Sequence, residues 1–443
     1  MLDLFEKGFA VLMLLYLSSG LTGFLAGDSP FNVWRVEDNP LLLVIQSLMY
    51  AVTFGFVLLH WRKFMSALRA GGWVLALAML ALVSTLWSSD PEFTFRRSLV
   101  VIATTVFGIY FGSRYQLSRQ VRLLGWGFII LAVLSAACAL LLPRYGIDHQ
   151  LHRGDWQGIL GQKNLLGKAM AVGMIVLWSA KGVLPRVLRM AGLSLCAGVM
   201  LMSGSRAAPA VLAALPLVVT GYRILRARMT TLVPLAIAFL ATGAGLVCLV
   251  VRNSSLLLAS LGRDMTLTRR TEIWSAVWSA ISSRMALGYG FSGFWAGIHG
   301  ESARVAARLG FVARHAHNGF LDLWLELGIA GLFLFVAGYL QAVGNGVKVV
   351  RMSHERLATW PLQYLAFVLL YDLAEGPILR QNNLYWALYV AVVVSAAQAV
   401  RRGQPWRQAR VPLESLEQQP GDLPRRTPGR LGDLHPESGR SAA

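Results

Sequence analysis

The chain has 443 residues, of which 56% are hydrophobic and only 14% are charged, and its formal net charge at pH 7 is +19. This composition excludes a soluble globular protein, because so few charged residues could not cover its surface. It predicts an all-α polytopic membrane protein. The cysteines, Cys138, Cys196 and Cys248, all lie in apolar runs, which argues against both a disulfide framework and a thiolate metal site.

Apolar runs near the length that a helix needs to cross a bilayer recur along the chain, and we expect about 12 transmembrane helices, with ten or eleven as the alternative. The runs are 9–26, 41–59, 72–87, 98–113, 123–142, 165–180, 187–202, 207–220, 231–251, 319–342, 360–379 and 384–400. The first is expected to be retained, because the N-terminus has no convincing signal-peptide cleavage site.

Positive charge indicates which side of the membrane each loop occupies. The basic loops follow every second apolar run and contain Arg62, Lys63, Arg69, Arg114, Arg119, Arg122, Lys181, Arg186, Arg189, Arg223, Arg226, Arg228, Lys348, Arg351 and Arg356. By the positive-inside rule these loops and both termini are cytoplasmic, and the long loop 252–318 lies on the outer side of the membrane. The membrane domain is expected to span 1–400, followed by a disordered, basic cytoplasmic tail at 401–443 that could touch anionic headgroups.

The loop 252–318 is unusually basic, with eight Lys or Arg residues against three Asp or Glu residues. A bias of this size suggests an anionic ligand. Within the loop, the run 266–278 is predicted to form an amphipathic helix that starts near Thr271. Trp274 and Trp278 fall on one face of this helix, which is typical of a helix lying on the outer membrane surface.

Arginines at two places need a compensating charge. Arg269 and Arg270 precede the predicted helix, where the helix dipole disfavours them, so a ligand anion or a nearby acid should offset their charge. Arg206 lies in the turn SGSRAA beside an apolar run, where an arginine is costly unless it snorkels, pairs or faces a wet cavity. The simpler interpretation is that Arg206 snorkels to the membrane surface. For Arg269 and Arg270, the simpler interpretation is that both side chains are solvated.

Two further polar clusters lie on the same predicted side. Gln162, Lys163 and Asn164 stand at the expected start of a helix, where unpaired backbone amides favour anions; a capped, interfacially anchored helix end is the alternative. His315 and His317 would lie on different sides of a helix, so a zinc site would need strand geometry and a further ligand, and no metal site is predicted. His317, at the mouth of a span, suits a neutral base, or else a hydrogen-bonded interfacial histidine, whereas His315 should lie further out and be wetter.

Several motifs in this order resemble the O-antigen ligase/polymerase superfamily, and they are most similar to its exopolysaccharide polymerases of the Wzy/ExoQ type. They are LWSSDPEFTFRRS at 86–98, GDWQGILGQKNLLG, SGSR, RRTEIW, GYGFSGFW and HAHNGFLDLWLELGIAG, and the resemblance covers roughly residues 85–400. It implies a glycosyltransferase of the bacterial inner membrane that needs neither a metal nor another cofactor. The implied donor is a glycan carried on undecaprenyl diphosphate, and the implied active site faces the periplasm.

The family's functional residues fall on Arg206, Arg270 and His317. The resemblance implies that the arginines hold the donor diphosphate and neutralise the charge that grows as the sugar–phosphate bond breaks. It implies that His317 accepts the proton of the attacking hydroxyl. The family more often has His-Lys-Asn where this chain has Gln162-Lys163-Asn164, so no acid–base role is assigned to Gln162, while Lys163 can still bind phosphate. The expected substrate-binding residues are Lys163, Asn164, Gln162, Arg269, His315 and Glu375, the last from within the apolar run 360–379.

The leading interpretation is polymerisation of lipid-linked repeat units into exopolysaccharide. A ligase that passes finished glycan to lipid A-core or another acceptor shares every motif and is the first alternative. A transporter of an anionic lipid-linked sugar is the second, and it is disfavoured because charged residues in the middle of spans are scarce. The expected partners are the glycan donor, the glycan acceptor, membrane lipids, and a chain-length regulator and flippase of the same pathway, with no nucleic acid.

Overall fold

A computed structural model describes residues 1–20, 39–149, 153–213, 265–295, 300–313, 315–353, 355–373, 375–376 and 378–403. Contacts divide the chain into 1–406 and 407–443, and all of the described residues belong to the first unit. Within these ranges the regular elements are all helices, which agrees with the predicted class. The expected span 231–251 and most of the expected tail at 401–443 lie outside the described residues.

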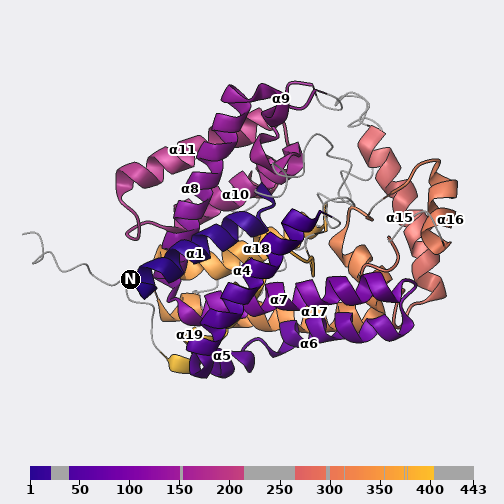
Figure 1. Ribbon diagram of the computed structural model, residues 1–443, viewed down its shortest axis with the longest axis horizontal. Coiled ribbons are helices and arrows are strands. Elements are labelled where there is room, and N and C mark those ends of the chain that lie inside the picture. The colour runs from indigo at the N-terminus through magenta and orange to yellow at the C-terminus, as the bar shows by residue number, and fades with distance from the viewer. Residues whose placement is uncertain are drawn as a thin grey trace, which may run out of the picture. The chain divides into compact units, whose positions relative to one another are not determined.

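The helices follow one another as shown in Figure 1. They are α1 (Leu2–Leu17), α4 (Pro40–Leu59), α5 (Trp61–Leu68), α6 (Gly72–Val83), α7 (Pro91–Arg114), α8 (Leu117–Leu141), α9 (Pro143–Gly146), α10 (Lys163–Ser179), α11 (Arg186–Met202), α15 (Met265–Ser283), α16 (Gly300–Leu309), α17 (Gly319–Met352), α18 (Trp360–Asp372) and α19 (Leu384–Arg402). Short 3-10 turns lie at Ser84–Trp87, Gly158–Leu160 and Arg356–Thr359.

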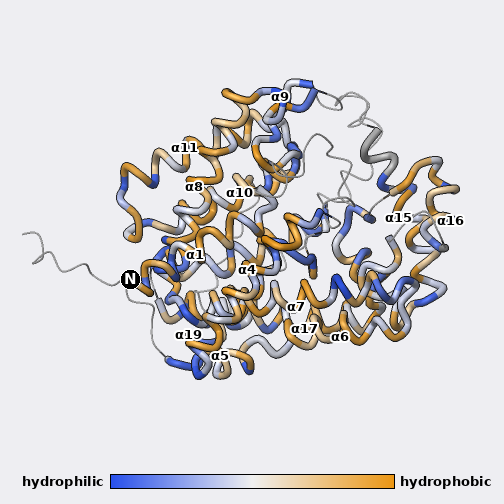
Figure 2. Tube along the Cα trace, in the orientation of Figure 1, coloured by the Kyte–Doolittle hydropathy of each residue, from blue (hydrophilic) through white to orange (hydrophobic). Residues whose placement is uncertain are grey.

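Five helices in the described part of the chain are long and apolar enough to cross a membrane: α4, α7, α8, α17 and α19. A sixth span results if α5 and Gly72–Trp87, which meet at 87°, count as one broken helix. The remaining expected runs that are described also contain helices, but α1, α6, α10, α11 and α18 are shorter, at 12 to 17 residues. Figure 2 shows hydrophobic residues along much of the helical tube. These findings fit a multi-pass membrane protein, while the expected count of about 12 spans stays a prediction.

Two predicted spans differ from the expectation: one ends early, and the other is interrupted by a break. The run 360–379 was expected to be one span, but α18 ends at Asp372. Gly376 and Pro377 follow closely, and proline cannot continue a helix because it lacks the backbone N–H. The run 319–342 is interrupted at Gly328, where φ is 65° and ψ is −166°. Glycine is required there, because a Cβ at this position would collide with the backbone of Ala286. Because α18 ends early, the residues that follow it form a loop that can carry site residues.

The core of the helical bundle is built on α19, which packs most extensively against α7. Two glycines of α7 allow this close approach, since a Cβ at Gly108 would lie 2.7 Å from the Ala387 carbonyl oxygen, and one at Gly112 would lie 2.7 Å from that of Ala391. Small residues at helix contacts are typical of membrane proteins, where close van der Waals packing drives association. Most residues of α19 are accordingly buried.

A second cluster of buried side chains forms in the cation-rich region, between α15, the segment 287–295, α16 and the start of α17. The segment 287–295 also bonds to the start of α7 and the turn before it. Thr94 Oγ1 donates to the Phe291 carbonyl oxygen (2.8 Å), and the Phe291 amide donates to Ser84 Oγ (2.9 Å). This contact joins two of the motifs that carry the family resemblance. The described part of 252–318 is thus packed structure rather than an open loop.

The structure corrects two expectations for α15. The helix begins at Met265 rather than near Thr271, so Arg270 lies inside it instead of preceding it. Trp274 is partly buried and packs against the second cluster, where its Nε1 donates to the Ala316 carbonyl oxygen (2.8 Å). Trp278 is 49% exposed and packs edge-on against Trp324. The hydrophobic face of α15 is therefore used mainly for folding.

The predicted topology can be tested with single cysteines, after the native cysteines are replaced. Ala307 is exposed on α16, so a cysteine at this position should react with an impermeant thiol reagent in intact spheroplasts. Arg119 is exposed near the start of α8, and a cysteine at this position should be protected because that side is predicted to be cytoplasmic. Ser302 on α16 is buried and would be a poor probe. Labelling at position 119 together with protection at position 307 would invert the topology.

Candidate functional site

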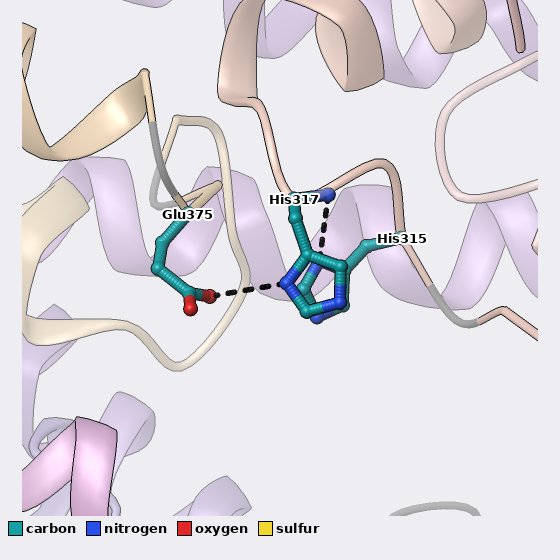
Figure 3. A group of neighbouring side chains, drawn as sticks. All are labelled: His315, His317 and Glu375. Carbon is teal, nitrogen blue, oxygen red and sulfur yellow. Dashed lines mark hydrogen bonds and ion pairs between the residues drawn. The ribbon is translucent and has the colours of Figure 1, made fainter. Parts of the chain in front are cut away.

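The turn before α17 brings its two histidines together. His317 has a positive φ of 51°, and its backbone N–H donates to Nδ1 of His315 (3.1 Å). The two rings lie 3.9 Å apart at an angle of 52° (Figure 3). Asn318 fixes the end of the turn, because its side chain accepts hydrogen bonds from the Phe320 and Leu321 amides and caps α17. A left-handed conformation at a non-glycine residue is uncommon and is concentrated at functional sites.

One buried acid, Asp322, holds this turn from the inside. Oδ1 of Asp322 accepts hydrogen bonds from the Ala316 amide (2.9 Å) and from Nε1 of Trp295 (3.0 Å), and its Oδ2 lies 3.5 Å from Nη2 of Arg380. Trp295 belongs to the glycine-rich GYGFSGFW segment. This segment therefore supports the histidine turn through Asp322.

Glu375, in the loop after α18, contacts both a histidine and an arginine. Its Oε2 lies 3.9 Å from Nδ1 of His317 (Figure 3), and its Oε1 lies 3.8 Å from Nη2 of Arg270 on α15. Burial favours the neutral form of the carboxyl, but the interaction with His317 and the nearby positive charge of Lys168 outweigh burial and lower the pKa of Glu375 to about 2. The site therefore combines a histidine, a carboxylate and an arginine from three separate segments.

His315 differs from the expectation that it would lie further out and be wetter. Its side chain is only partly exposed and packs on the ring of His317. Burial, together with the positive charge of Arg380 and Arg270, lowers the pKa of His315 to about 3. The backbone fold of the turn brings its ring back toward the protein, which the two-residue spacing did not reveal. A side chain that stays neutral there is suited to support the turn rather than to bind an anion.

Charged residues that the sequence analysis did not assign to the site are buried around it. Lys168 of α10 lies over the ring of Tyr385 (3.9 Å) and that of Tyr371 (4.7 Å). Asp322, Glu326 and Asp372 are also buried. These four charged residues lie near the ends of α10, α17 and α18. Charges inside apolar runs are a sequence signal of function, and this signal could have identified these residues.

A second group of predicted residues lies where the loop before α10 meets the turn after α11. Nζ of Lys163 pairs with Asp155 at 2.9 Å, and Gly204 packs directly against that carboxylate. Arg206 is exposed two residues further on. Lys163 is thus neutralised by an acid of the chain itself, rather than standing as an uncompensated phosphate ligand.

The start of α10 connects this group with α18. Gln162 is exposed and precedes α10 without capping it by its side chain, and the Asn164 carbonyl oxygen accepts a hydrogen bond from Tyr371 (3.4 Å). Tyr371 lies directly before Asp372 at the end of α18. Of the remaining predicted residues, the side chain of Arg269 lies outside the part of the structure that is described.

Comparison with known proteins identifies the central part of the chain. Residues 191–336 match the family described as O-antigen ligase. This range of the chain therefore resembles the O-antigen ligase family. A relative, the exopolysaccharide production protein ExoQ of Rhizobium meliloti (strain 1021), is 25% identical over 314 residues, which cover 68% of this chain and 70% of the relative. The resemblance to the O-antigen ligase superfamily is confirmed.

The range that matches the O-antigen ligase family contains some of the site residues and omits others. Arg206, Arg270 and His317 lie within 191–336, whereas Lys163 and Glu375 lie outside it. The site is therefore completed by α10, which precedes the matched range, and by the loop after α18, which follows it.

One group in the described structure has the residue types and spacing to hold a metal ion. His315, His317 and Glu375 each offer one ligand atom, and these atoms lie within 4.8 Å of one another. The sequence analysis required a further ligand beside the two histidines, and Glu375 lies where it could supply one. However, Glu375 also faces Arg270, and Lys168 and Arg380 lie close by, so the surrounding positive charge opposes a divalent cation.

Proposed function

We propose that the chain polymerises oligosaccharide repeat units, carried on undecaprenyl diphosphate, into exopolysaccharide at the periplasmic face of the inner membrane. A role in polysaccharide biosynthesis is supported by the match to the O-antigen ligase family and by the similarity to ExoQ. The observation that carries the reaction class is the contact set of His317, Glu375 and Arg270, which places a candidate base beside a candidate diphosphate ligand.

In the proposed reaction, an acceptor hydroxyl attacks the anomeric carbon of the donor glycan. The new oxygen–carbon bond forms as the bond between the anomeric carbon and the phosphate oxygen breaks, and the bonding electrons leave with undecaprenyl diphosphate. His317 takes the hydroxyl proton. Because Nδ1 faces Glu375, Nε2 is the nitrogen that faces the acceptor.

Arg270 and Arg206 are the proposed ligands of the donor diphosphate. A guanidinium group binds phosphate oxygens bidentately and stabilises the negative charge that develops on the leaving group. Lys163, Asn164, Gln162 and Arg269 remain proposed substrate-binding residues. For Lys163 this role requires an exchange of partners, because its ammonium group is paired with Asp155 before the donor arrives.

We propose that the reaction needs no divalent metal ion. The arginines can neutralise the diphosphate. The positive charge around Glu375 disfavours binding of a divalent metal ion there. Polymerisation by the purified protein should therefore be unchanged in excess EDTA. Loss of activity in EDTA, with recovery on adding magnesium, manganese or zinc, would instead assign a metal to His315, His317 and Glu375.

A ligase is the second candidate, because the matched family is described as O-antigen ligase. The two functions differ in the acceptor. Purified protein supplied with lipid-linked repeat units alone should form a ladder of longer glycans, with no need for lipid A-core. Product that forms only when lipid A-core is added, and that carries one glycan per core, would favour the ligase. A chain-length regulator and a flippase remain predicted partners.

A further inference from the structure

Glu375 occupies a place that its sequence position did not suggest. The sequence analysis assigned it to substrate binding, from within an expected span. In the structure it is partly buried in the loop after α18, and each of its two carboxylate oxygens faces a different cation-forming side chain. Oε2 faces His317 (Figure 3), and Oε1 faces Arg270. One carboxylate therefore connects the turn before α17 with α15.

A direct contact between Glu375 and the donor is not favoured by charge. The donor diphosphate is an anion, and a carboxylate beside it would be repelled at short distance. An ionised acid is useful in such a site when it acts on the cationic groups that touch the substrate. Both partners of Glu375 are of this kind in the proposed function.

Asp322, a second acid beside the turn, is engaged elsewhere. Asp322 accepts from Trp295 and from the Ala316 amide and lies beside Arg380. Among the described acids, Glu375 is the one within ion-pair distance of His317. The loop that holds it is short, because α18 ends at Asp372 and α19 begins at Leu384. Both ends of this loop are thus fixed by buried helices.

We propose that Glu375 is a positioning residue, which holds His317 and Arg270 in register for glycan transfer and does not bind the donor itself. This inference rests on the proposed function. By facing Nδ1, the carboxylate selects the ring orientation that presents Nε2 to the acceptor hydroxyl. It also stabilises the imidazolium ion that forms when the proton is taken, as the buried acid does in catalytic triads. Through Oε1 it holds Arg270 near the base while leaving the rest of the guanidinium group for phosphate.

The first test compares Glu375→Gln with Glu375→Asp in purified protein. Glu375→Gln keeps the shape but loses the charge, so kcat should fall by roughly 10- to 100-fold while the KM for the lipid-linked donor stays within about twofold. Glu375→Asp keeps the charge and should recover part of kcat. The matched control is Glu301→Gln, which removes an acid paired with Arg304 on α16 and should leave both constants unchanged. A normal kcat in Glu375→Gln, or a loss confined to donor KM, overturns the proposal.

A double-mutant cycle separates this inference from the proposed function. If Glu375 acts through His317, adding Glu375→Gln to His317→Ala should cause little further loss, because the two changes remove one shared function. Full multiplication of the two losses overturns the positioning role. An active His317→Ala variant overturns the proposed function instead, whatever Glu375→Gln does. Equal thermal stability of the single variants excludes a folding defect as the cause.

Discussion

His317→Ala should lower the rate of glycan transfer by about 100- to 10,000-fold, which is the usual contribution of a general base. The side chain is 36% exposed at the site, with Nδ1 directed at Glu375, so its loss removes the proton acceptor without emptying the core. Binding of the lipid-linked donor should remain, because the proposed diphosphate ligands are arginines. The measurement is turnover of a lipid-linked repeat unit in matched membranes, with donor binding measured alongside.

Two other histidines provide controls for this result. His149 is exposed and bonds only locally to the Pro143 carbonyl oxygen, so His149→Ala should keep turnover within about twofold. His315→Ala should cost less than His317→Ala, since His315 supports the turn but does not face Glu375 through an ion pair. Near-normal turnover in His317→Ala would refute the base role. Lost donor binding would make His317 a donor ligand.

Arg270→Lys should lower polymer formation by roughly 100-fold, even though it keeps the positive charge. Lysine cannot reproduce the planar fork that binds phosphate bidentately, and removing one donor to a developing anion typically costs about 100- to 1,000-fold. The lysine variant also loses the contact that the Arg270 guanidinium group makes with Glu375. Polymer yield should be measured against protein level, with Arg304→Lys on the exposed face of α16 as the matched control.

Arg206→Lys should show a loss of the same kind, because the proposed diphosphate site uses both arginines. Arg206 belongs to a different segment from Arg270, so a shared phenotype would link the turn after α11 with α15. Normal polymer in both lysine variants would contradict the diphosphate assignment. Arg263, Arg269 and Arg314 would then be the remaining candidates in the basic region.

The long apolar runs were predictable because hydropathy alone determines them. The expected run 41–59 corresponds to Pro40–Leu59, and 123–142 corresponds to Leu117–Leu141. Helix ends were less predictable, because they depend on tertiary contacts. The break at Gly328 is set by the backbone of Ala286, which lies far away in the sequence.

The candidate site was predictable in part. Resemblance directed attention to His317 and Arg270, and the structure brings both to one carboxylate. The partner roles of Glu375 and Arg380 could not be read from the sequence, because hydropathy merges the loop after α18 with the preceding span. The packing of His315 against His317 depends on a positive φ at His317, which no sequence pattern specified.

The most direct test of the central claim measures bond formation and lipid release together. Purified protein in liposomes receives a lipid-linked repeat unit with separate labels on the glycan and on the lipid diphosphate. The account predicts one undecaprenyl diphosphate released for each glycosidic bond formed, with both products lost in parallel in His317→Ala. Movement of intact lipid-linked glycan across the bilayer, with no lengthening and no release, would contradict it and identify a transporter.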